Sequence, residues 1–384
     1  MKKLAIVSTH PIQYNAPWFK LLAQREAVEL KVFYTWSQSQ HSVTDKVFGK
    51  EITWDIPLLE GYDYEFVENV SKTPGSHHFF GIDCPKLIDR LKSFDANAIL
   101  FFGWNFKSHL KAMRYFHGKT QVWFRGDSTL LDETSGLKTI LRRLILKRVY
   151  SYVDKAFYVG QASKAYFLKH GLKEQQLVYA PHAIDNDRFN DNSNENYKAQ
   201  ALKWRAELGF KPKDIVILFA GKLEHKKQPD FLLETFMNHK DSSDADLQLL
   251  IVGDGPLKDD LQSKAGTDVR WLPFQNQTQM PIVYRLGDII CLPSKGPGET
   301  WGLAVNEAMA CGKPAIVTDK VGCAFDLIES GKTGFIFNHE SKAELKDILV
   351  NLNKSSLQSM GKNAKEKIRL FNFLAIVEAI EQSL

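Results

Sequence analysis

The segment "LAIVSTHPIQYNAPWFKLLAQREAVELKVFYT" (residues 4–35) contains two short apolar runs with a helical pattern between them. The run LAIVST has the length and the branched residues of a buried strand, and ELKVFYT follows the helix-like APWFKLLAQRE. Short buried strands that alternate with helices indicate a parallel sheet covered by helices. This segment therefore predicts an α/β fold from the first residues onward.

The same alternation continues along both halves of the chain. Further strands are expected at 98–103, 120–124 and 155–160, and again at 214–221, 247–255 and 288–294. Between the halves, DNDRFNDNSNEN (185–196) is rich in Asn and Asp and is the best linker candidate. We expect two facing Rossmann-like domains, 1–190 and 197–365, and an amphipathic helix at 366–384 that packs back toward the first. Ligands of open parallel sheets bind beyond the carboxyl ends of the strands, so the cleft between the domains is the expected site.

The composition is that of an ordinary globular protein, with 44% hydrophobic and 25% charged residues in a chain of 384. The apolar run at the N-terminus, Leu4 to Val7, is too short for a signal-peptide core. No run approaches the roughly 18 apolar residues that a membrane-spanning helix needs. Cys84, Cys291, Cys311 and Cys323 lack CxxC spacing, so they indicate neither a zinc site nor a disulfide framework. A reducing cytoplasmic location is expected.

The stretch "GPGETWGLAVNEAMACGKPAIVTD" (296–319) places two glutamates, Glu299 and Glu307, eight positions apart. We expect Glu299 where a helix begins, with the amides of Thr300 to Leu303 directed at a bound anion such as a diphosphate. In a helix the two glutamates would lie about 12 Å apart. That is too far for the carboxylate pair of a retaining glycosidase, at roughly 5–5.5 Å, but it suits the two hydroxyl-bearing ends of a nucleotide-sugar. The alternative is that neither glutamate has a functional role, with Glu299 an exposed loop residue and Glu307 a residue on the helix surface.

Two lysines strengthen the interpretation as a diphosphate site. Lys222 and Lys227 lie in the loop GKLEHKK, directly after the strand DIVILFA. Cations at a carboxyl strand end can neutralise a diphosphate leaving group as its bond to the sugar breaks. The alternative is a pair of ordinary solvated lysines.

Five motifs, in this order and spacing, resemble the family-four glycosyltransferases: GKLEHKKQPDFLLETF, LLIVGDGPLKDDL, VRWLPF, DIICLPS and GETWGLAVNEAMACGKPAIVTDKVG. These are retaining nucleotide-sugar enzymes with the GT-B fold. The resemblance implies that Glu299 binds the donor sugar, that Glu307 binds the ribose, and that Lys222 and Lys227 bind the diphosphate. It also implies that the amides of Trp301, Gly302 and Leu303 contact the diphosphate and that backbone near Leu272 flanks the nucleobase. Arginine is common at position 222, and lysine keeps its charge but lacks the planar fork.

The first half departs from the family pattern. Its first turn, STHPIQYNAPW, lacks the usual glycines and instead places His10 beyond the strand end, with Asn15 as a helix cap and Pro17 early in the helix. His10 is expected either to donate a hydrogen bond to a phosphate or acceptor hydroxyl, or to pack within the turn.

Other candidates on the acceptor side also follow strands. Many relatives have a histidine after a central strand, where this chain has RGDST with Arg125 and Asp127. Asp127 either contacts a sugar hydroxyl, acts as a general base toward the acceptor, or stabilises a turn. Trp104 and His109 in FFGWNFKSH are weaker candidates, and packing explains Trp104 equally well.

A strongly basic segment suggests an anionic partner. Residues 101–150 hold ten Lys and Arg and three Asp and Glu. In LKTILRRLILKRVY one helix face would carry Leu137, Ile140, Leu141, Leu144 and Ile145, and the other face would carry Lys138, Arg142, Arg143, Lys147 and Arg148. Such a helix either faces the core or lies on anionic lipid. We expect peripheral contact with an anionic membrane through 137–148, at the inner face, and no nucleic-acid partner.

These features predict a retaining, metal-independent hexosyltransferase. It would move a sugar from a nucleoside diphosphate to an acceptor hydroxyl on a glycan or lipid-linked acceptor, in polysaccharide, lipopolysaccharide or glycolipid biosynthesis. No cofactor is expected. The triplets Asp185-Asn186-Asp187 and Asp244-Ala245-Asp246 lack a third ligand at useful spacing, so no metal site is predicted. The alternatives are a nucleotide-sugar epimerase or hydrolase on the same fold, and a nucleotide-sugar-binding protein without turnover.

Overall fold

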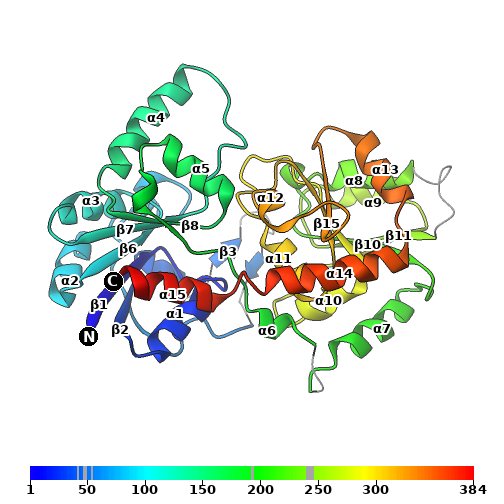
Figure 1. Cartoon of the computed structure of the whole chain (residues 1–384), viewed down its shortest axis with the longest axis horizontal. Helices are drawn as coiled ribbons and strands as arrows, with labels where there is room; N and C mark the ends of the chain where they lie inside the picture. Colours follow the sequence, from blue (N-terminus) through cyan, green and yellow to red (C-terminus); the bar gives the residue numbers. More distant parts are fainter. Residues whose placement is uncertain (41–42, 46–49, 53–54, 192–193, 239–245) are drawn as a thin grey trace. The chain divides into compact units, whose positions relative to one another are not determined.

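The chain forms two compact units, each built around one parallel sheet. The computed structural model describes residues 1–40, 43–45, 50–52, 55–191, 194–238 and 246–384. The N-terminal unit consists mainly of Met1–Thr44, Glu51–His182 and Phe373–Leu384, and the C-terminal unit of Ala183–Asn372. Figure 1 shows both units, coloured along the sequence.

The sheet of the N-terminal unit has seven strands in the order β5-β2-β1-β6-β7-β8-β9, and the neighbouring strands pair in parallel. The predicted strands at 4–9, 98–103, 120–124 and 155–160 are confirmed as β1, β6, β7 and β8. The strands are β1 (Lys2–Ser8), β2 (Val28–Tyr34), β5 (Asp63–Phe66), β6 (Ala98–Phe102), β7 (Gln121–Gly126), β8 (Lys155–Tyr158) and β9 (Leu177–Tyr179), and β3 (Val43–Asp45) with β4 (Lys50–Ile52) forms a separate pair.

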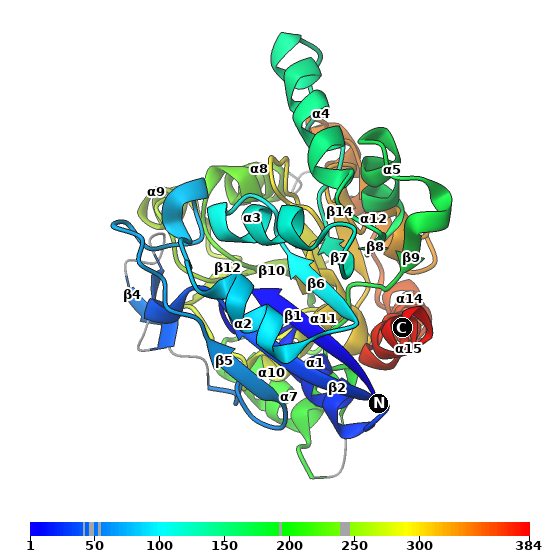
Figure 2. The ribbon, with the colours of Figure 1, turned by 90° about the vertical axis from the view of Figure 1, so that its left-hand side faces the viewer.

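Helices cover both faces of this sheet because successive strand residues point to opposite sides. On one face, Val7, Phe101 and Phe124 pack against helices that include α3 and α4. On the other face, Trp18 and Phe19 of α1 contact the ring of Phe102. The helices of this unit are α1 (Ala16–Gln24), α2 (Leu87–Phe94), α3 (Lys107–Phe116), α4 (Leu137–Tyr150), α5 (Gln161–Lys169) and α15 (Phe373–Ser383). In Figure 2, α4 projects from the unit beyond α3 and α5.

The C-terminal helix α15 belongs to the N-terminal unit. Arg25 donates two hydrogen bonds to the carboxylate of Glu381, at 2.8 and 2.9 Å. The amine of Lys155 donates to the carbonyl of Ser383 at 2.6 Å. The sequence predicts one helix over 366–384, whereas the structure has the end of α14 (Lys354–Ile368) there, followed by α15. The break lies at Arg369–Asn372, and α14 remains in the C-terminal unit.

The sheet of the C-terminal unit has six strands in the order β12-β11-β10-β13-β14-β15, again with parallel pairing. The strands expected at 214–221, 247–255 and 288–294 are confirmed as β10, β11 and β13. The six strands are β10 (Ile215–Ala220), β11 (Leu247–Val252), β12 (Val269–Leu272), β13 (Ile289–Leu292), β14 (Ala315–Thr318) and β15 (Gly334–Phe337).

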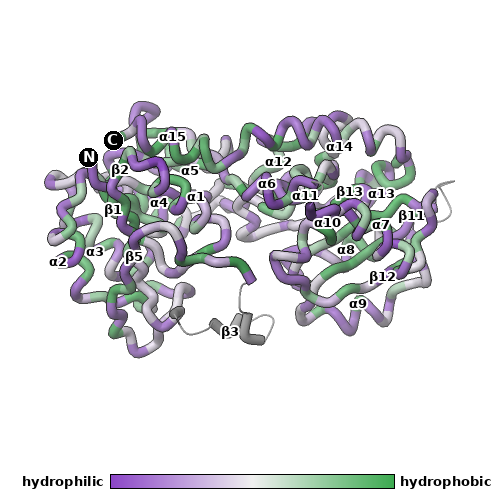
Figure 3. Tube along the Cα trace, turned by 90° about the horizontal axis from the view of Figure 1, so that it is seen from below, coloured by the Kyte–Doolittle hydropathy of each residue, from purple (hydrophilic) through white to green (hydrophobic). Residues whose placement is uncertain are grey.

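The core of this unit lies between the sheet and its helices. Phe219, Ile251 and Ile289 of the strands pack with Leu232 of α8 and Leu345 of α13. Figure 3 shows the contrast in hydropathy between strand β11 and the hydrophilic helix α9. The helices are α6 (Asn186–Phe189), α7 (Tyr197–Glu207), α8 (Pro229–Met237), α9 (Lys258–Lys264), α10 (Met280–Leu286), α11 (Leu303–Ala310), α12 (Ala324–Leu327), α13 (Lys342–Val350) and α14.

The first part of the predicted linker, residues 185–189, is more ordered than its composition indicates. Asp185 accepts a hydrogen bond from the backbone of Arg188 and caps the short helix α6. Phe189 is fully buried, and Asn186 donates to the carbonyls of Ile368 and Phe371. The sequence obscures this anchor because one phenylalanine among polar residues shows no periodicity. None of the helices in the described ranges is long and apolar enough to cross a membrane.

Candidate functional site

The two central strands of the C-terminal sheet, β10 and β13, mark its topological switch point. From β10 the chain winds outward through β11 and β12, and then returns to β13 and winds the other way. Loops at the carboxyl ends of such strands leave a crevice where ligands bind in open α/β sheets. The loop after β10 carries Lys222 and Lys227, and the loop after β13 carries Ser294 and Glu299. All four polar side chains therefore come from the loops at the switch point.

Lys227 and Glu299 form an ion pair at this position. The Lys227 amine contacts Oε2 of Glu299, and the two side chains are 20% and 11% exposed. The same oxygen accepts a hydrogen bond from the Ser294 hydroxyl at 2.8 Å. Ser294 is itself buried, and its carbonyl accepts from the hydroxyl of Thr318. An ion pair with little exposure, whose surroundings are held by hydrogen bonds from hydroxyl groups, is a preorganised polar site.

The segment between Glu299 and α11 differs from the expectation. The helix begins at Leu303, and Gly302 precedes it as its N-cap with φ +97°, so Glu299 does not lie at the helix start as predicted. The 12 Å separation, which assumed a continuous helix, no longer applies. Glycine fits this position because a β-carbon on Gly302 would lie 2.8 Å from the side chain of Val321. A second glycine, Gly322, donates its amide to the Glu299 carbonyl at 3.0 Å.

The amides that precede α11 retain capacity for a ligand. Within the described ranges of the chain, no group accepts a hydrogen bond from the amide of Gly302 or Leu303. The Trp301 side chain is buried and donates its indole N–H to Asn306 at 2.8 Å. Trp301 thus anchors the turn, and the adjacent amides lie at the positive end of the helix dipole.

Glu307 is buried in α11 instead of lying on the helix surface. Its side chain is 3% exposed, and Oε2 accepts a hydrogen bond from the Tyr284 hydroxyl of α10 at 2.6 Å. A carboxylate held this way keeps a fixed orientation. The sequence analysis did not identify Tyr284, because its position in an apolar helix segment resembles that of a core residue.

Lys222 and Leu272 lie at the ends of neighbouring strands. Lys222 is partly buried, two residues after β10. The carbonyl of Leu272, the last residue of β12, accepts the amide of Gly253 at 3.0 Å. A β-carbon on Gly253 would lie 2.0 Å from the carbonyl oxygen of Gly221, so the chain segments that follow β10 and β11 approach closely. The motif Gly-Asp-Gly thus keeps these loops close together.

The N-terminal sheet has its own switch point, between β1 and β6, where His10 and Trp104 follow the strands. Nδ1 of His10 lies 2.9 Å from the Thr9 hydroxyl, and its ring meets the Trp36 ring edge-on at 5.4 Å. Burial, and secondarily His77, lowers the pKa of His10 to about 4, so the ring is neutral at pH 7. Trp104 is partly buried and packs against the core of the unit, so packing accounts for at least part of its role.

Two residues predicted for the acceptor side are structural. His109 is fully buried, with Nε2 2.8 Å from the Thr35 hydroxyl and Nδ1 2.9 Å from the Gly103 carbonyl. Both ring nitrogens are occupied, and burial lowers the pKa of His109 to about 4. Arg125 is buried as well, and burial lowers its pKa to about 10. These expectations are wrong because both side chains turn into the protein.

Arg125 fixes the chain segment that follows β9. Its two terminal nitrogens donate to the carbonyls of Ala180 and Pro181 at 2.7 and 2.9 Å. The next residue, His182, brings Nε2 to 3.5 Å from Oδ2 of Asp127. Burial lowers the pKa of His182, and Asp127 partly offsets that effect. Asp127, whose side chain is 43% exposed, therefore has a histidine beside it that the sequence analysis missed.

Of the two acidic triplets, only Asp185-Asn186-Asp187 lies wholly within the described residues. Asp185 is the cap of α6, and Asp244 and Ala245 lie outside the described residues. Among the residues that the structure does describe, no three His, Cys, Asp or Glu side chains gather as metal ligands.

Comparison with known proteins finds a family match within the C-terminal unit. Residues 200–367, somewhat under half of the chain, match the family model described as "Glycosyl transferases group 1". The resemblance inferred from the motifs is thereby confirmed over this segment. A D-inositol 3-phosphate glycosyltransferase of Nocardia farcinica is 30% identical over 194 residues, 47% of this chain and 42% of that protein. The sulfoquinovosyl transferase of Arabidopsis thaliana is 26% identical over 206 residues, 51% of this chain and 37% of that protein. The chain thus spans less than half the length of these curated relatives.

Solved structures extend the fold similarity to the whole chain. Anabaena HepE, in a crystal structure with UDP, superimposes with a TM-score of 0.72 at 17% identity, covering 100% of this chain and 99% of that one. The lipopolysaccharide glycosyltransferase WaaG gives a TM-score of 0.65 at 15% identity, with 99% of both chains covered. The predicted GT-B fold, with two Rossmann-like domains and a C-terminal helix, is confirmed.

Proposed function

We propose that this chain, whose residues 200–367 match the group 1 glycosyl transferases, transfers a hexose-type sugar from a nucleoside diphosphate to an acceptor hydroxyl with retention of the anomeric configuration. The observation that carries the proposal is the partly buried cluster of Lys227, Glu299 and Ser294 at the switch point of the C-terminal sheet. The cluster lies inside the matched segment, and its residues are those that the motifs single out.

The chemistry requires stabilisation of the leaving group. As the bond between the anomeric carbon and the diphosphate oxygen breaks, negative charge develops on the diphosphate, and the acceptor oxygen forms the new bond to that carbon. We propose that Lys222, Lys227 and the amides of Gly302 and Leu303 meet this charge as prearranged donors. Glu299 would then exchange part of its contact with Lys227 for the sugar hydroxyls. Glu307, oriented by Tyr284, would bind the ribose, and backbone near Leu272 would flank the base.

On the N-terminal unit, we assign the acceptor side to Asp127 with His182, and to His10. An exposed carboxylate beside a histidine can contact a sugar hydroxyl or accept the acceptor proton. The neutral ring of His10 would offer a hydrogen bond at the switch point of this sheet. An Asp127→Asn variant that turns over at the wild-type rate would remove Asp127 from this assignment.

The experiment that tests the proposal is proton NMR of the purified chain with UDP-, GDP-, ADP- and TDP-sugars and a panel of alkyl glycosides as acceptors. We expect one donor to be consumed only with an acceptor and to give a glycoside with the donor's anomeric configuration. An inverted product would contradict retention. Turnover is expected to persist in EDTA, because we propose a metal-independent reaction, and its loss would contradict that part.

The alternative on the same fold is a nucleotide-sugar epimerase or hydrolase. Free hydrolysed or epimerised sugar as the sole product, with acceptors present, would favour it. Donor binding without any product would favour a nucleotide-sugar-binding protein. The complete set of Glu299, Glu307, Lys222 and Lys227 favours turnover over binding alone.

A further inference from the structure

Helix α4 exposes a continuous apolar stripe. Leu137, Ile140, Leu141, Leu144 and Ile145 are exposed by 85%, 55%, 60%, 60% and 49%. Helical spacing places all five on one side of the helix. The opposite side carries Leu146, Val149 and Tyr150, which are buried in the core of the N-terminal unit.

The exposed stripe does not contribute to holding α4 in place. The C-terminal half of the helix is anchored by its buried side, and the N-terminal half extends beyond the core (Figure 2). Isolated exposed leucines are common on soluble proteins, but five adjacent aliphatic side chains on one helix side form a patch of the kind that marks an interaction surface.

The charges on α4 indicate the kind of partner that the stripe binds. Helix α4 contains five basic residues and no acidic one. At about 100° per residue, Lys138 and Lys147 fall on the two edges of the apolar stripe, and Arg148 falls in line with it. The basic side chains are not all available, since Arg143 pairs with Glu133. An apolar stripe with cations along both edges complements a surface with an apolar interior and anionic head groups.

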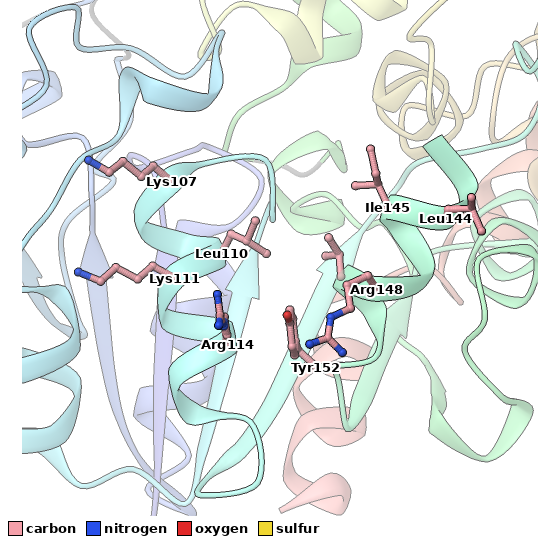
Figure 4. Close-up of a pocket in the computed structure, with 9 residues that line it drawn as sticks. Lys107, Leu110, Lys111, Arg114, Leu144, Ile145, Arg148 and Tyr152 are labelled. Atoms are coloured by element: carbon pink, nitrogen blue, oxygen red, sulfur yellow. The ribbon is translucent and has the colours of Figure 1, made fainter. Parts of the chain in front are cut away.

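A groove beside the stripe also combines apolar side chains with basic ones. It has a volume of about 600 Å³ and lies between α3 and α4. In Figure 4, Leu110 points from α3 toward α4, and the Arg148 side chain extends toward Tyr152. The Arg148 guanidinium lies 5.0 Å from the Tyr152 ring centre. Arg114 of α3 also lines the groove, so the groove joins apolar walls to two guanidinium groups, which bind phosphate oxygens well.

We propose that α4, together with the groove between α3 and α4, docks the N-terminal unit onto the surface of an anionic phospholipid bilayer. The apolar stripe enters the boundary between head groups and acyl chains, and Lys138, Lys147 and Arg148 contact lipid phosphates. The inference rests on the exposure of α4 and the charge around it, and it does not depend on the proposed glycosyl transfer.

The test is co-sedimentation of the purified chain with vesicles made of equal parts phosphatidylglycerol and phosphatidylcholine, compared with phosphatidylcholine alone. We expect binding to the anionic vesicles that weakens with salt, and little binding to the neutral ones. The variant Leu141→Ser/Leu144→Ser/Ile145→Ser should lower the partition coefficient roughly tenfold or more. The variant Lys138→Glu/Lys147→Glu should lower it for anionic vesicles only.

Matched controls come from the C-terminal unit. Leu202, Phe325 and Leu370 are exposed by 59%, 66% and 71%, and their replacement by serine removes a similar apolar area. Lys203→Glu/Lys362→Glu makes the same charge change on exposed positions. Both controls should bind vesicles as the wild type does. The midpoint of thermal unfolding should be close to that of the wild type for every variant, because all substituted side chains are exposed.

Three results would overturn the inference. One is a wild-type chain that stays in the supernatant with anionic vesicles. Another is binding that survives the triple serine substitution in α4. The third is self-association of the wild type, abolished by that substitution, without vesicle binding; it would assign the stripe to contact with a second copy of the chain.

Discussion

The two sheets have the same design, but the side chains at their strand ends behave differently. In the C-terminal unit, Lys227, Glu299 and Ser294 form a polar cluster at the switch point. In the N-terminal unit, Arg125 lies near the end of β7 and His109 lies in α3 after β6, yet both turn inward and bind backbone carbonyls. The position of a single polar residue near the end of a strand is therefore a weak indicator of a site. A set of motif residues at characteristic spacing, contributed by several loops, is a strong indicator.

Loop composition explains part of this contrast. The C-terminal loops contain glycines such as Gly302 and Gly253, where a β-carbon would meet neighbouring protein atoms, so these loops can lie closer together than side chains would allow. The first N-terminal turn has no glycine, and its histidine is partly buried against Trp36. We expect substitutions to affect turnover in the C-terminal unit and mainly stability at the buried N-terminal positions.

The largest expected effect is on turnover at the C-terminal cluster. Glu299→Ala and Lys227→Ala should each lower kcat by roughly 100- to 1000-fold, because each removes a preorganised group at the reacting centre. The fold-loss of kcat in the double variant should be smaller than the product of the fold-losses in the two single variants, since the groups act together. Steady-state kinetics, with the donor that the panel of nucleotide-sugars selects, measures all three variants.

A neighbouring ion pair supplies the control. Glu329 and Lys332 form an exposed pair in the same unit, and Glu329→Ala should leave kcat and the unfolding midpoint almost unchanged. Near-normal kcat in Glu299→Ala would end the assignment of that carboxylate to the donor site.

The second effect is on stability in the N-terminal unit. Arg125→Met removes the donors to the carbonyls of Ala180 and Pro181, and two buried acceptors left unpaired cost about 2–4 kcal/mol. Urea unfolding followed by tryptophan fluorescence should show a lower midpoint for this variant than for the wild type. An unchanged midpoint together with lost turnover would instead place Arg125 in the chemistry, against the structure.

The smallest effect is a dependence of stability on pH. The pKa of His109 is about 4 in the folded chain and about 6.5 when unfolded. Between these values the unfolded state binds a proton that the folded state does not, so stability falls as pH falls from 6.5 toward 4. For His109 the loss is about 2 kcal/mol between pH 6.5 and 5.

His109→Gln removes this titratable group. The free energy of unfolding should therefore decrease less steeply for the variant than for the wild type as pH falls from 6.5 to 5. His10 adds a loss of the same sign and should remain in both. Identical slopes for wild type and variant would contradict the buried, neutral state of His109.

The fold was predictable from the sequence because buried parallel strands are short apolar runs that alternate with helices. The strands containing Ile6, Ile99 and Ile217 all lie where that pattern places them. Helix ends were less predictable: α11 begins at Leu303, because Gly302 with its positive φ precedes the helix, and not at Glu299. Such a boundary depends on a backbone angle that only tertiary contacts fix.

The candidate site was predictable where side chains carry a motif and not where they meet a partner distant in sequence. Ser294 and Tyr284, which contact Glu299 and Glu307, are recognised only once the loops are folded together. His182 meets Asp127 because Arg125 fixes the preceding carbonyls. For the helix at 137–148 the sequence left two orientations open, because the same periodicity suits a helix that faces a core, and the structure shows the apolar stripe of α4 exposed.

The most direct test of the central claim is isothermal titration calorimetry of UDP-, GDP-, ADP- and TDP-sugars with the wild type, Lys227→Ala and Glu307→Gln. The glutamine variant keeps an acceptor for the Tyr284 hydroxyl and so separates ligand contact from folding. We predict that the wild type binds sugars of one nucleotide, and that both variants bind them at least about tenfold more weakly. Equal affinity in all three proteins, or binding of none of the donors by the wild type, would contradict a nucleotide-sugar site at the ends of β10 and β13.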